Sequence, residues 1–260
     1  MDRRGVLSTL GAVAAAGATA SVGGCVERVG LGGSAVAERE PPDRPETLTP
    51  TTVAEYVAAT EETYAHNHHA RNGATAVSVT ATATFDYEAV GGYHATAQHA
   101  GSVRADGDET AEVSSRPIPY RVTDDATLRL PVDREQVGSA AAEGGEGNAA
   151  ADEVASPLGV RVANVLDRAR EVSLRVTRQE DGETLFEAAR TVDGRQAVEL
   201  RGIAARPGSY RVVARFAEDG VTGEGRIDVE LPHVDRGPNV DVLSSSRGFA
   251  TRPLPRFEPI

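Results

Sequence analysis

The chain has 260 residues and a formal net charge of −12, and its 27 basic residues are all arginine. We expect no nucleic acid partner, because phosphate binding requires a basic stripe that so acidic a chain does not offer. Aromatic residues make up 4% and tryptophan is absent, so large apolar side chains are scarce. Such a composition suits high salt, where surface carboxylates keep a protein hydrated and the Debye length is about 3 Å at 1 M. An ordinary acidic protein from a GC-rich genome is the alternative.

Residues 1–24 have the pattern of an export signal. Arg3 and Arg4 precede an apolar run over residues 6–22, which is shorter than the roughly 20 mainly apolar residues of a membrane span. Cys25 is the one cysteine of the chain and follows two glycines, small residues that let an extended chain enter a peptidase cleft. We predict a twin-arginine signal and a lipid on Cys25. A noncleaved anchor helix is the alternative.

The paired arginine, the sequence Val22-Gly23-Gly24-Cys25, the acid excess and the missing lysine together resemble the twin-arginine lipoproteins of halophilic archaea. The resemblance covers the signal and the overall composition only. It implies export by the twin-arginine pathway and attachment to the outer face of the cell membrane through lipid. It supplies no catalytic residues. Val6 departs from the pattern, because such signals often place a bulkier apolar residue there.

The mature chain begins with a tether and an α+β module. Residues 25–49 combine a glycine-rich stretch with clustered prolines, and neither can build a core. Residues 50–133 predict one helix over 50–71, with capping-box spacing of Thr52 and Glu55 and a stop at Gly73, followed by an antiparallel meander. The helix should pack on one face of the sheet, in a pattern that resembles the cystatin-like fold.

The second half predicts a β-sandwich. Residues 134–156 are of low complexity and indicate an acidic linker between domains, with a long loop inside one domain as the alternative. Residues 157–232 alternate between apolar and polar side chains, with regular turns, as in an antiparallel sandwich. The sequence Pro207-Gly208-Ser209-Tyr210 resembles a turn of immunoglobulin-like domains in which a tyrosine hydroxyl bonds back to the preceding connection. Residues 233–260 predict an extended or disordered tail.

The best candidate for a metal site lies on the predicted helix. Glu62, His66 and His69 share the face opposite the apolar stripe, and their spacing offers a metal up to three ligands. That face should be open to solvent and no second motif accompanies it, so we expect neither a metal nor another cofactor. We expect His68, at the margin of the stripe, to be a partly buried packing residue.

Other chemistry has weaker support. The serines do not lie in a Gly-x-Ser-x-Gly motif, and the predicted mature domains contain no thiol. Acidic pairs should be solvated surface features; they are Glu61-Glu62, Asp124-Asp125 and Glu180-Asp181.

We therefore expect a mainly β, noncatalytic surface lipoprotein that acts in interaction or envelope structure, with the membrane and an envelope protein as partners. An exported metal-dependent hydrolase using Glu62, His66 and His69 is the first alternative. An accessory solute-capture protein is the second. If Glu62, His66 and His69 lie together in one pocket, the hydrolase is favoured over the binding module.

Overall fold

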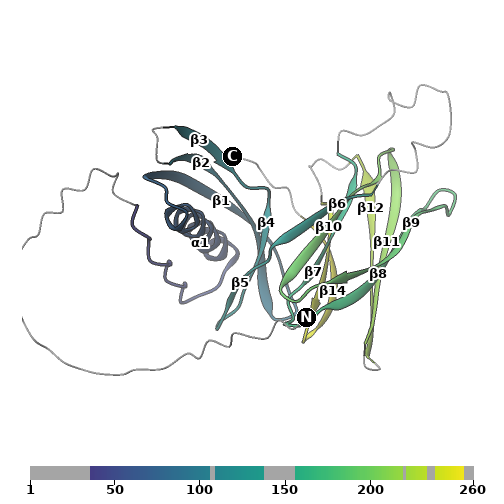
Figure 1. Cartoon of the computed structure of the whole chain (residues 1–260). Coiled ribbons are helices and arrows are strands. Elements are labelled where there is room, and N and C mark those ends of the chain that lie inside the picture. Colours follow the sequence, from purple (N-terminus) through teal and green to yellow (C-terminus); the bar gives the residue numbers. More distant parts are fainter. Residues whose placement is uncertain (1–35, 106–108, 138–155, 219–220, 233–237, 255–260) are drawn as a thin grey trace, which may run out of the picture. The chain divides into compact units, whose positions relative to one another are not determined.

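Figure 1 shows a computed structural model of the chain, which describes residues 36–105, 109–137, 156–218, 221–232 and 238–254. The described part is mainly β with one helix, as expected. Arg3, Arg4 and Cys25 lie outside the described residues, so the structure does not test the predicted signal or lipid site. Among the described residues, no helix has both the length and the hydropathy needed to cross a membrane.

Helix α1 spans Pro50–Arg71. The backbone N–H of Thr52 donates to Oγ1 of Thr49 at 3.2 Å, and the N–H of Thr49 donates to Oγ1 of Thr52 at 2.9 Å. This capping box lies three residues before the predicted one, because a threonine side chain at the third position satisfies the N-cap amide in place of a glutamate. The helix ends before Gly73, whose φ of +84° suits glycine, as predicted.

The first sheet is antiparallel and has five strands in the order β1-β2-β4-β5, with β3 paired to the far end of β2. Helix α1 packs on one face of this sheet (Figure 1). Its buried Val53 and Val57 meet Ala95 and Ala97 of β2, which are small enough to let the helix approach closely. The strands are β1 (Ala76–Ala89), β2 (Gly92–Arg104), β3 (Thr110–Ser114), β4 (Ile118–Val122) and β5 (Thr127–Arg129).

Strand β1 contains a bulge at Asp86. Phe85 pairs with Ala95 and Tyr87 pairs with His94, so Asp86 has no partner in the register. Successive side chains of a regular strand alternate between faces, and a bulge breaks this alternation. Asp86 and Tyr87 can therefore both reach the same buried cluster on the face away from α1.

The remaining strands form two packed sheets, in the orders β14-β13-β7-β10-β6 and β12-β11-β8-β9. Valine and leucine side chains from both sheets fill the space between them, as expected for a sandwich. The hydroxyl of Tyr210 donates to the carbonyl of Arg206 at 2.7 Å, which is the bond that the turn predicted. The strands are β6 (Val132–Gln136), β7 (Leu158–Asn164), β8 (Arg170–Arg178), β9 (Thr184–Val192), β10 (Gln196–Ala204), β11 (Gly208–Glu218), β12 (Val221–Leu231), β13 (Val240–Ser245) and β14 (Gly248–Pro253).

Within residues 157–232 the described strands pair antiparallel, as predicted. Two strands from outside that range join the sandwich in parallel, β6 beside β10 and β13 beside β7, so two boundary predictions need correction. Residues 134–136, predicted as linker, and Val132, predicted in the first module, belong to β6; residues 138–155 lie outside the described part. The predicted tail over 233–260 is wrong for residues 238–254, where Val240 and Val242 insert into the core and form a strand there.

The two halves of the fold share a buried boundary. Tyr87 and Leu130 of the first half pack with Ala163 and Leu243 of the sandwich in one apolar cluster. Every residue of β7 is buried, because its two faces contact different sheets. The described residues of both halves belong to one compact unit. The division into two separately folding modules stays a prediction.

Candidate functional site

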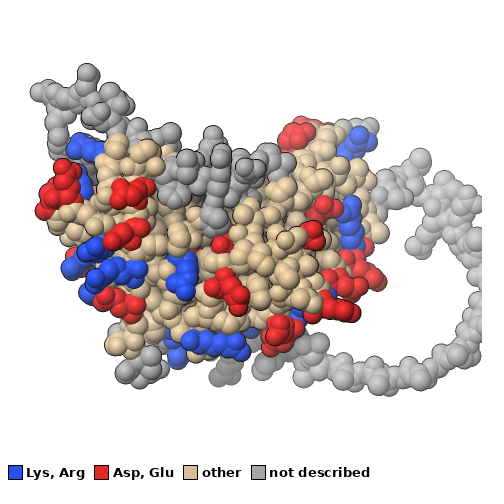
Figure 2. Space-filling view, turned by 180° about the vertical axis from the view of Figure 1, so that it is seen from behind, with Lys and Arg blue, Asp and Glu red and all other residues tan. Residues whose placement is uncertain are grey.

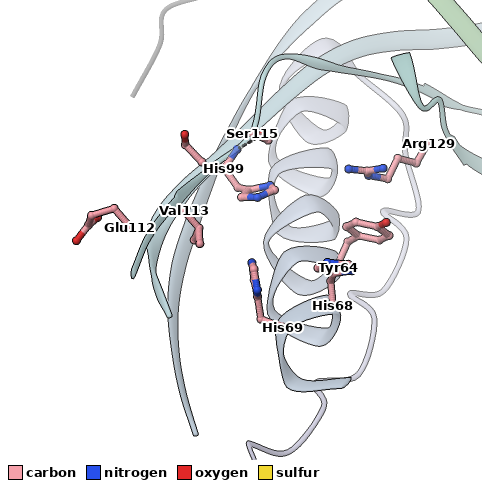
Figure 3. Close-up of a pocket in the computed structure, with 9 residues that line it drawn as sticks. Tyr64, His68, His69, His99, Glu112, Val113, Ser115 and Arg129 are labelled. Atoms are coloured by element: carbon pink, nitrogen blue, oxygen red, sulfur yellow. Dashed lines mark hydrogen bonds between the residues drawn. The ribbon is translucent and has the colours of Figure 1, made fainter. Parts of the chain in front are cut away.

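A pocket of about 580 Å³ lies beside the C-terminal half of α1. Figure 3 shows the imidazoles of His69 and His99 facing this space, while the carboxylate of Glu112 turns away from it. The volume is in the range of small-molecule sites. Its lining residues are Tyr64, His68 and His69 of α1, His99 of β2, Glu112, Val113 and Ser114 of β3, Ser115, and Arg129 of β5.

The wall of the pocket is held by Glu61, which is fully buried. Its carboxylate accepts hydrogen bonds from Nδ1 of His99 at 2.7 Å and from the hydroxyl of Tyr120 at 2.5 Å. Nε and Nη2 of Arg129 donate to the same carboxylate at 2.8 and 3.3 Å. One helical side chain thus fixes residues from β2, β4 and β5.

The prediction that Glu61 is a solvated surface residue is wrong. Glu61 continues the buried series of Val53 and Val57 at intervals of four residues, so it faces the sheet. The four-residue interval is visible in the sequence. An exposed position was predicted nevertheless, because acidic side chains are seldom buried. His99 likewise continues the helix-facing alternation of Ala95 and Ala97 along β2.

Electrostatics keep Glu61 ionised. Burial alone would raise its pKa, but the donors His99, Arg129 and Tyr120 lower the pKa to about 2. Burial and the Glu61 charge raise the pKa of Tyr120, so the phenol remains a donor. An ionised carboxylate only accepts hydrogen bonds, so the hydrogen of the contact belongs to Nδ1 of His99. Nε2 of His99 is left for the pocket.

A row of stacked side chains, Arg129, Tyr64, His68 and His69, lies along the helix side of the pocket. The guanidinium carbon of Arg129 lies 3.9 Å from the centroid of the Tyr64 ring, and His68 stacks on Tyr64 at 6.3 Å. The rings of His68 and His69 meet edge to face at 5.3 Å. Burial, followed by the proximity of His68 and His99, lowers the pKa of His69. His68 is exposed, so the expectation that it packs in a partly buried place is wrong.

The predicted metal candidates are not brought together. Glu62 pairs with Arg39 at 2.8 Å, and Nε2 of His66 contacts the carbonyl oxygen of Ala37 at 3.0 Å. His66 is buried, contrary to the expected open face, because the chain around Ala37 runs along this side of α1. Only His69 of the three lines the pocket. Within the described ranges, no group of three or more histidine, cysteine or acidic residues is placed to hold a metal.

A second polar cluster lies at the boundary between the two halves. Arg161 of β7 donates to Asp241 at 2.7 and 3.1 Å, to Asp86 at 3.2 Å and to Thr96 at 3.0 Å. The hydroxyl of Tyr87 donates to Asp241. These side chains are buried and bonded to one another, so the cluster joins the two halves of the fold.

The two carboxylates of this cluster titrate differently. Burial raises the pKa of Asp86 to about 6, although Arg161 and Thr96 oppose this. Burial acts in the same way on Asp241, but the charge and hydrogen bonds of Arg161 outweigh it and lower its pKa. Arg161 is therefore matched mainly by Asp241, and Asp86 is the first of the pair to take up a proton.

The arginines on the outer face of the second sandwich sheet pair with acids. Examples are Arg175 with Glu187 at 2.5 Å and Arg215 with Glu224 at 2.7 Å. Figure 2 shows acidic and arginine side chains next to one another on one face of the molecule. Asp124 and Asp125 are exposed, as predicted, and so are Glu180 and Asp181. Exposed pairs of this kind contribute little to stability.

No protein family, curated protein or solved structure matches this chain.

Proposed function

We propose that the protein is a noncatalytic binding module held at the outer face of the cell membrane by a lipid on Cys25, with the pocket beside α1 as its ligand site. The contact set of Glu61 carries this proposal. One buried carboxylate fixes His99, Arg129 and Tyr120 from three strands, so the polar wall of the pocket is organised before a ligand arrives. Pre-organisation lowers the entropic cost of binding.

The location is proposed from the sequence. Arg3, Arg4 and Cys25 support twin-arginine export and lipid attachment, and the acidic, lysine-free composition supports an outward-facing protein in high salt. The finer fold assignments are also proposals. The helix on one sheet face supports the cystatin-like pattern, and the bond from Tyr210 to Arg206 supports the immunoglobulin-like one.

A binding role suits the chemistry of the pocket better than metal-dependent hydrolysis. Glu62 and His66 are engaged elsewhere, and Glu61, with a pKa of about 2, has no proton to donate near neutral pH. Capture of a solute, the second alternative from the sequence, is one form of the binding role. A pocket of about 580 Å³ accommodates a small metabolite.

The contact between Glu61 and His99 also favours a second candidate function. A carboxylate bonded to Nδ1 of a histidine orients the imidazole, as in hydrolases that use histidine as a general base. Nε2 of His99 would be the base in such an enzyme. The experiment below separates this candidate from the binding module.

The test is retention of small molecules from a metabolite extract of the source cells, read by native mass spectrometry. Val113→Trp should fill the pocket from β3, because Val113 pairs with Gly101 and so lies on the same sheet face as His99, and Ser173→Trp on the exposed side of β8 is the control. We expect the parent and Ser173→Trp to retain a compound of unchanged mass that Val113→Trp does not retain. Equal retention by all three proteins would overturn the proposal, and a compound altered only by proteins with an open pocket would establish the enzyme.

A further inference from the structure

Four arginines surround one valine on the outer face of the second sandwich sheet. Val213 of β11 pairs with Arg175 of β8 on one side and with Arg226 of β12 on the other. Arg211 and Arg215 lie two residues before and after Val213, and side chains two residues apart share a face of a strand. The residues between them on β11 are buried in the core, so the four arginines face outward. We call these four arginines the arginine cross.

The arginine cross encloses a hollow of about 370 Å³. The Cα atoms of Arg211 and Arg215 are about 13 Å apart along β11, and those of Arg175 and Arg226 about 10 Å apart across it, so the long side chains can converge above Val213. Arg178 and four uncharged residues complete the described lining, which contains no acid. Each guanidinium group is a planar fork of donors that matches the oxygens of an oxyanion.

The carboxylates that balance the arginine cross lie on neighbouring strands, outside this lining. Each accepts from its cross-strand arginine at 2.5–2.8 Å, and Glu224 is shared, because Arg226 contacts it as well, at 3.3 Å. Four guanidinium groups therefore share three carboxylates. Arg178 has its own acids in Asp181 and Glu183. The cross-strand pairs are Arg175 with Glu187, Arg211 with Asp228 and Arg215 with Glu224.

A ligand can replace these surface pairs. Exposed ion pairs contribute little to stability, and a carboxylate that is released returns to water. To replace three carboxylates, however, the ligand must bring comparable negative charge, which a monovalent anion does not. Two linked phosphate groups carry about three charges and offer acceptor oxygens on both phosphorus atoms.

The surrounding acids also limit the size of the ligand. Glu187, Glu224 and Asp228 are exposed beside the hollow, and the whole chain has a net charge of −12. A long polyanion or an anionic membrane surface would have to lie across these carboxylates, and like charges repel. A compact ligand seated over Val213 avoids them.

We propose that the arginine cross binds a compact ligand with two linked phosphate groups, either free pyrophosphate or the diphosphate group of a small organic molecule. The phosphate oxygens accept hydrogen bonds from guanidinium groups of β8, β11 and β12, while the three carboxylates turn to solvent. The site shares no residue with the pocket beside α1. It is therefore a second site, beyond the proposed function.

The test is calorimetric titration of the full chain with pyrophosphate at pH 8 and constant ionic strength, without divalent cations. We expect one pyrophosphate per chain, bound at least tenfold more tightly than sulfate, which brings less charge. Adenosine diphosphate separates the two sources: tighter binding than pyrophosphate supports an organic diphosphate, and weaker binding supports the free anion. Absence of pyrophosphate binding, or equal affinity for sulfate, would overturn the proposal.

Two substitutions of arginine locate the site. Arg226→Gln removes the guanidinium that shares its carboxylate, and Glu224 keeps Arg215 as a partner, so binding should weaken at least tenfold. Arg39→Gln is the matched control, because Arg39 also forms a surface pair, with Glu62, but lies outside the hollow. Unchanged binding by Arg226→Gln would overturn the proposal.

Two substitutions at the centre separate charge from shape. Val213→Glu places a carboxylate among the four guanidinium groups and should abolish binding, whereas the neutral Val213→Gln of the same shape should bind within a few fold of the parent. Equal affinities of these two variants would contradict the charge argument. A heparin oligosaccharide that binds more tightly than pyrophosphate and depends on Arg226 would replace the compact ligand by an extended one.

The two binding sites are tested separately. In the metabolite screen, a compound held by the arginine cross should be kept by Val113→Trp and lost by Arg226→Gln. A ligand of the pocket beside α1 should show the reverse dependence. Failure of either site therefore leaves the other standing.

Discussion

Nδ1 of His99 lies 2.7 Å from Oε1 of Glu61, a residue with no exposed surface in the middle of α1. The contact joins the helix to β2 at a buried position, where a pair of apolar side chains is more common. A buried carboxylate is tolerated only when its oxygens are bonded, and Tyr120 and Arg129 complete this requirement. The same bonds orient His99 and Arg129, which line the pocket.

Glu61→Gln should destabilise the protein. The pKa of Glu61 is lowered from 4.5 to about 2 on folding, which corresponds to about 3 kcal/mol at about 1.4 kcal/mol per pH unit. Because the folded pKa is the lower one, this stabilisation is fully present above pH 4.5 and disappears as the pH falls towards 2. Urea denaturation should therefore show a large deficit at pH 7 that shrinks in acid.

Glu62→Gln is the matched control for that substitution. Glu62 is the neighbouring acid and pairs with Arg39 at the surface, so its loss should change the free energy of unfolding by less than about 1 kcal/mol. Equal effects of the two substitutions, or a Glu61→Gln deficit independent of pH, would contradict the role given to Glu61.

Asp86→Asn and Asp241→Asn should have opposite effects at pH 8. The folded pKa of Asp86 is raised from 3.8 to about 6, so its ionisation opposes folding above pH 6 and has no effect below 3.8. Asp86→Asn should then be neutral or stabilising by up to about 3 kcal/mol at pH 8. Asp241→Asn removes the main partner of Arg161 and should cost about 3–5 kcal/mol.

Urea denaturation at pH 4 and pH 8 measures both substitutions. The benefit of Asp86→Asn should be absent at pH 4, where the parent carboxyl is already protonated. If Asp86→Asn proves the more damaging of the two at pH 8, then Asp86 rather than Asp241 is the principal partner of Arg161.

Cleavage within residues 138–155 should leave two fragments that remain associated. The buried contacts of Arg161 with Asp86 and of Tyr87 with Asp241, and the packing of Tyr87 with Leu243, cross between the halves on either side of that segment. Limited proteolysis followed by size-exclusion chromatography should give one peak containing both fragments, and calorimetry should give one unfolding transition. Fragments that separate and melt independently would support two autonomous domains instead.

Cys25→Ser should release the protein from membranes or leave it unprocessed. Without the thiol, no lipid can be attached at the predicted first residue of the mature chain. Fractionation of cells and medium, with the parent protein and an Arg3→Lys, Arg4→Lys variant alongside, measures the distribution. A Cys25→Ser protein that is processed and still bound to membranes would refute the lipid anchor.

Prediction from the sequence succeeded for elements whose local order of apolar, polar and turn residues agrees with their burial in the fold. The helix over 50–71, its stop before Gly73 and the hydroxyl bond of Tyr210 all follow from short-range signals. The hairpin of β13 and β14 was missed because its prolines suggested a tail. Its burial depends on β7, which is more than 70 residues earlier in the chain, and local sequence does not show such a partner.

The candidate site was missed for a related reason. Glu61 lies at the correct helical interval to be buried, yet an acid at that position is explained only by donors on three separate strands. Likewise the bulge at Asp86 places two successive side chains in one cluster, which a simple alternation of faces does not predict. In both places a polar residue is buried because distant residues complete its hydrogen bonds.

The most direct test of the account is the titration of Glu61 itself. The carboxyl ¹³C signal of Glu61, assigned with the Glu61→Gln variant, should titrate near pH 2, and the ¹⁵N shifts of neutral His99 should show the hydrogen on Nδ1. A Glu61 signal that titrates near its ordinary value of 4.5, with the hydrogen of His99 on Nε2, would show that this carboxylate does not organise the pocket.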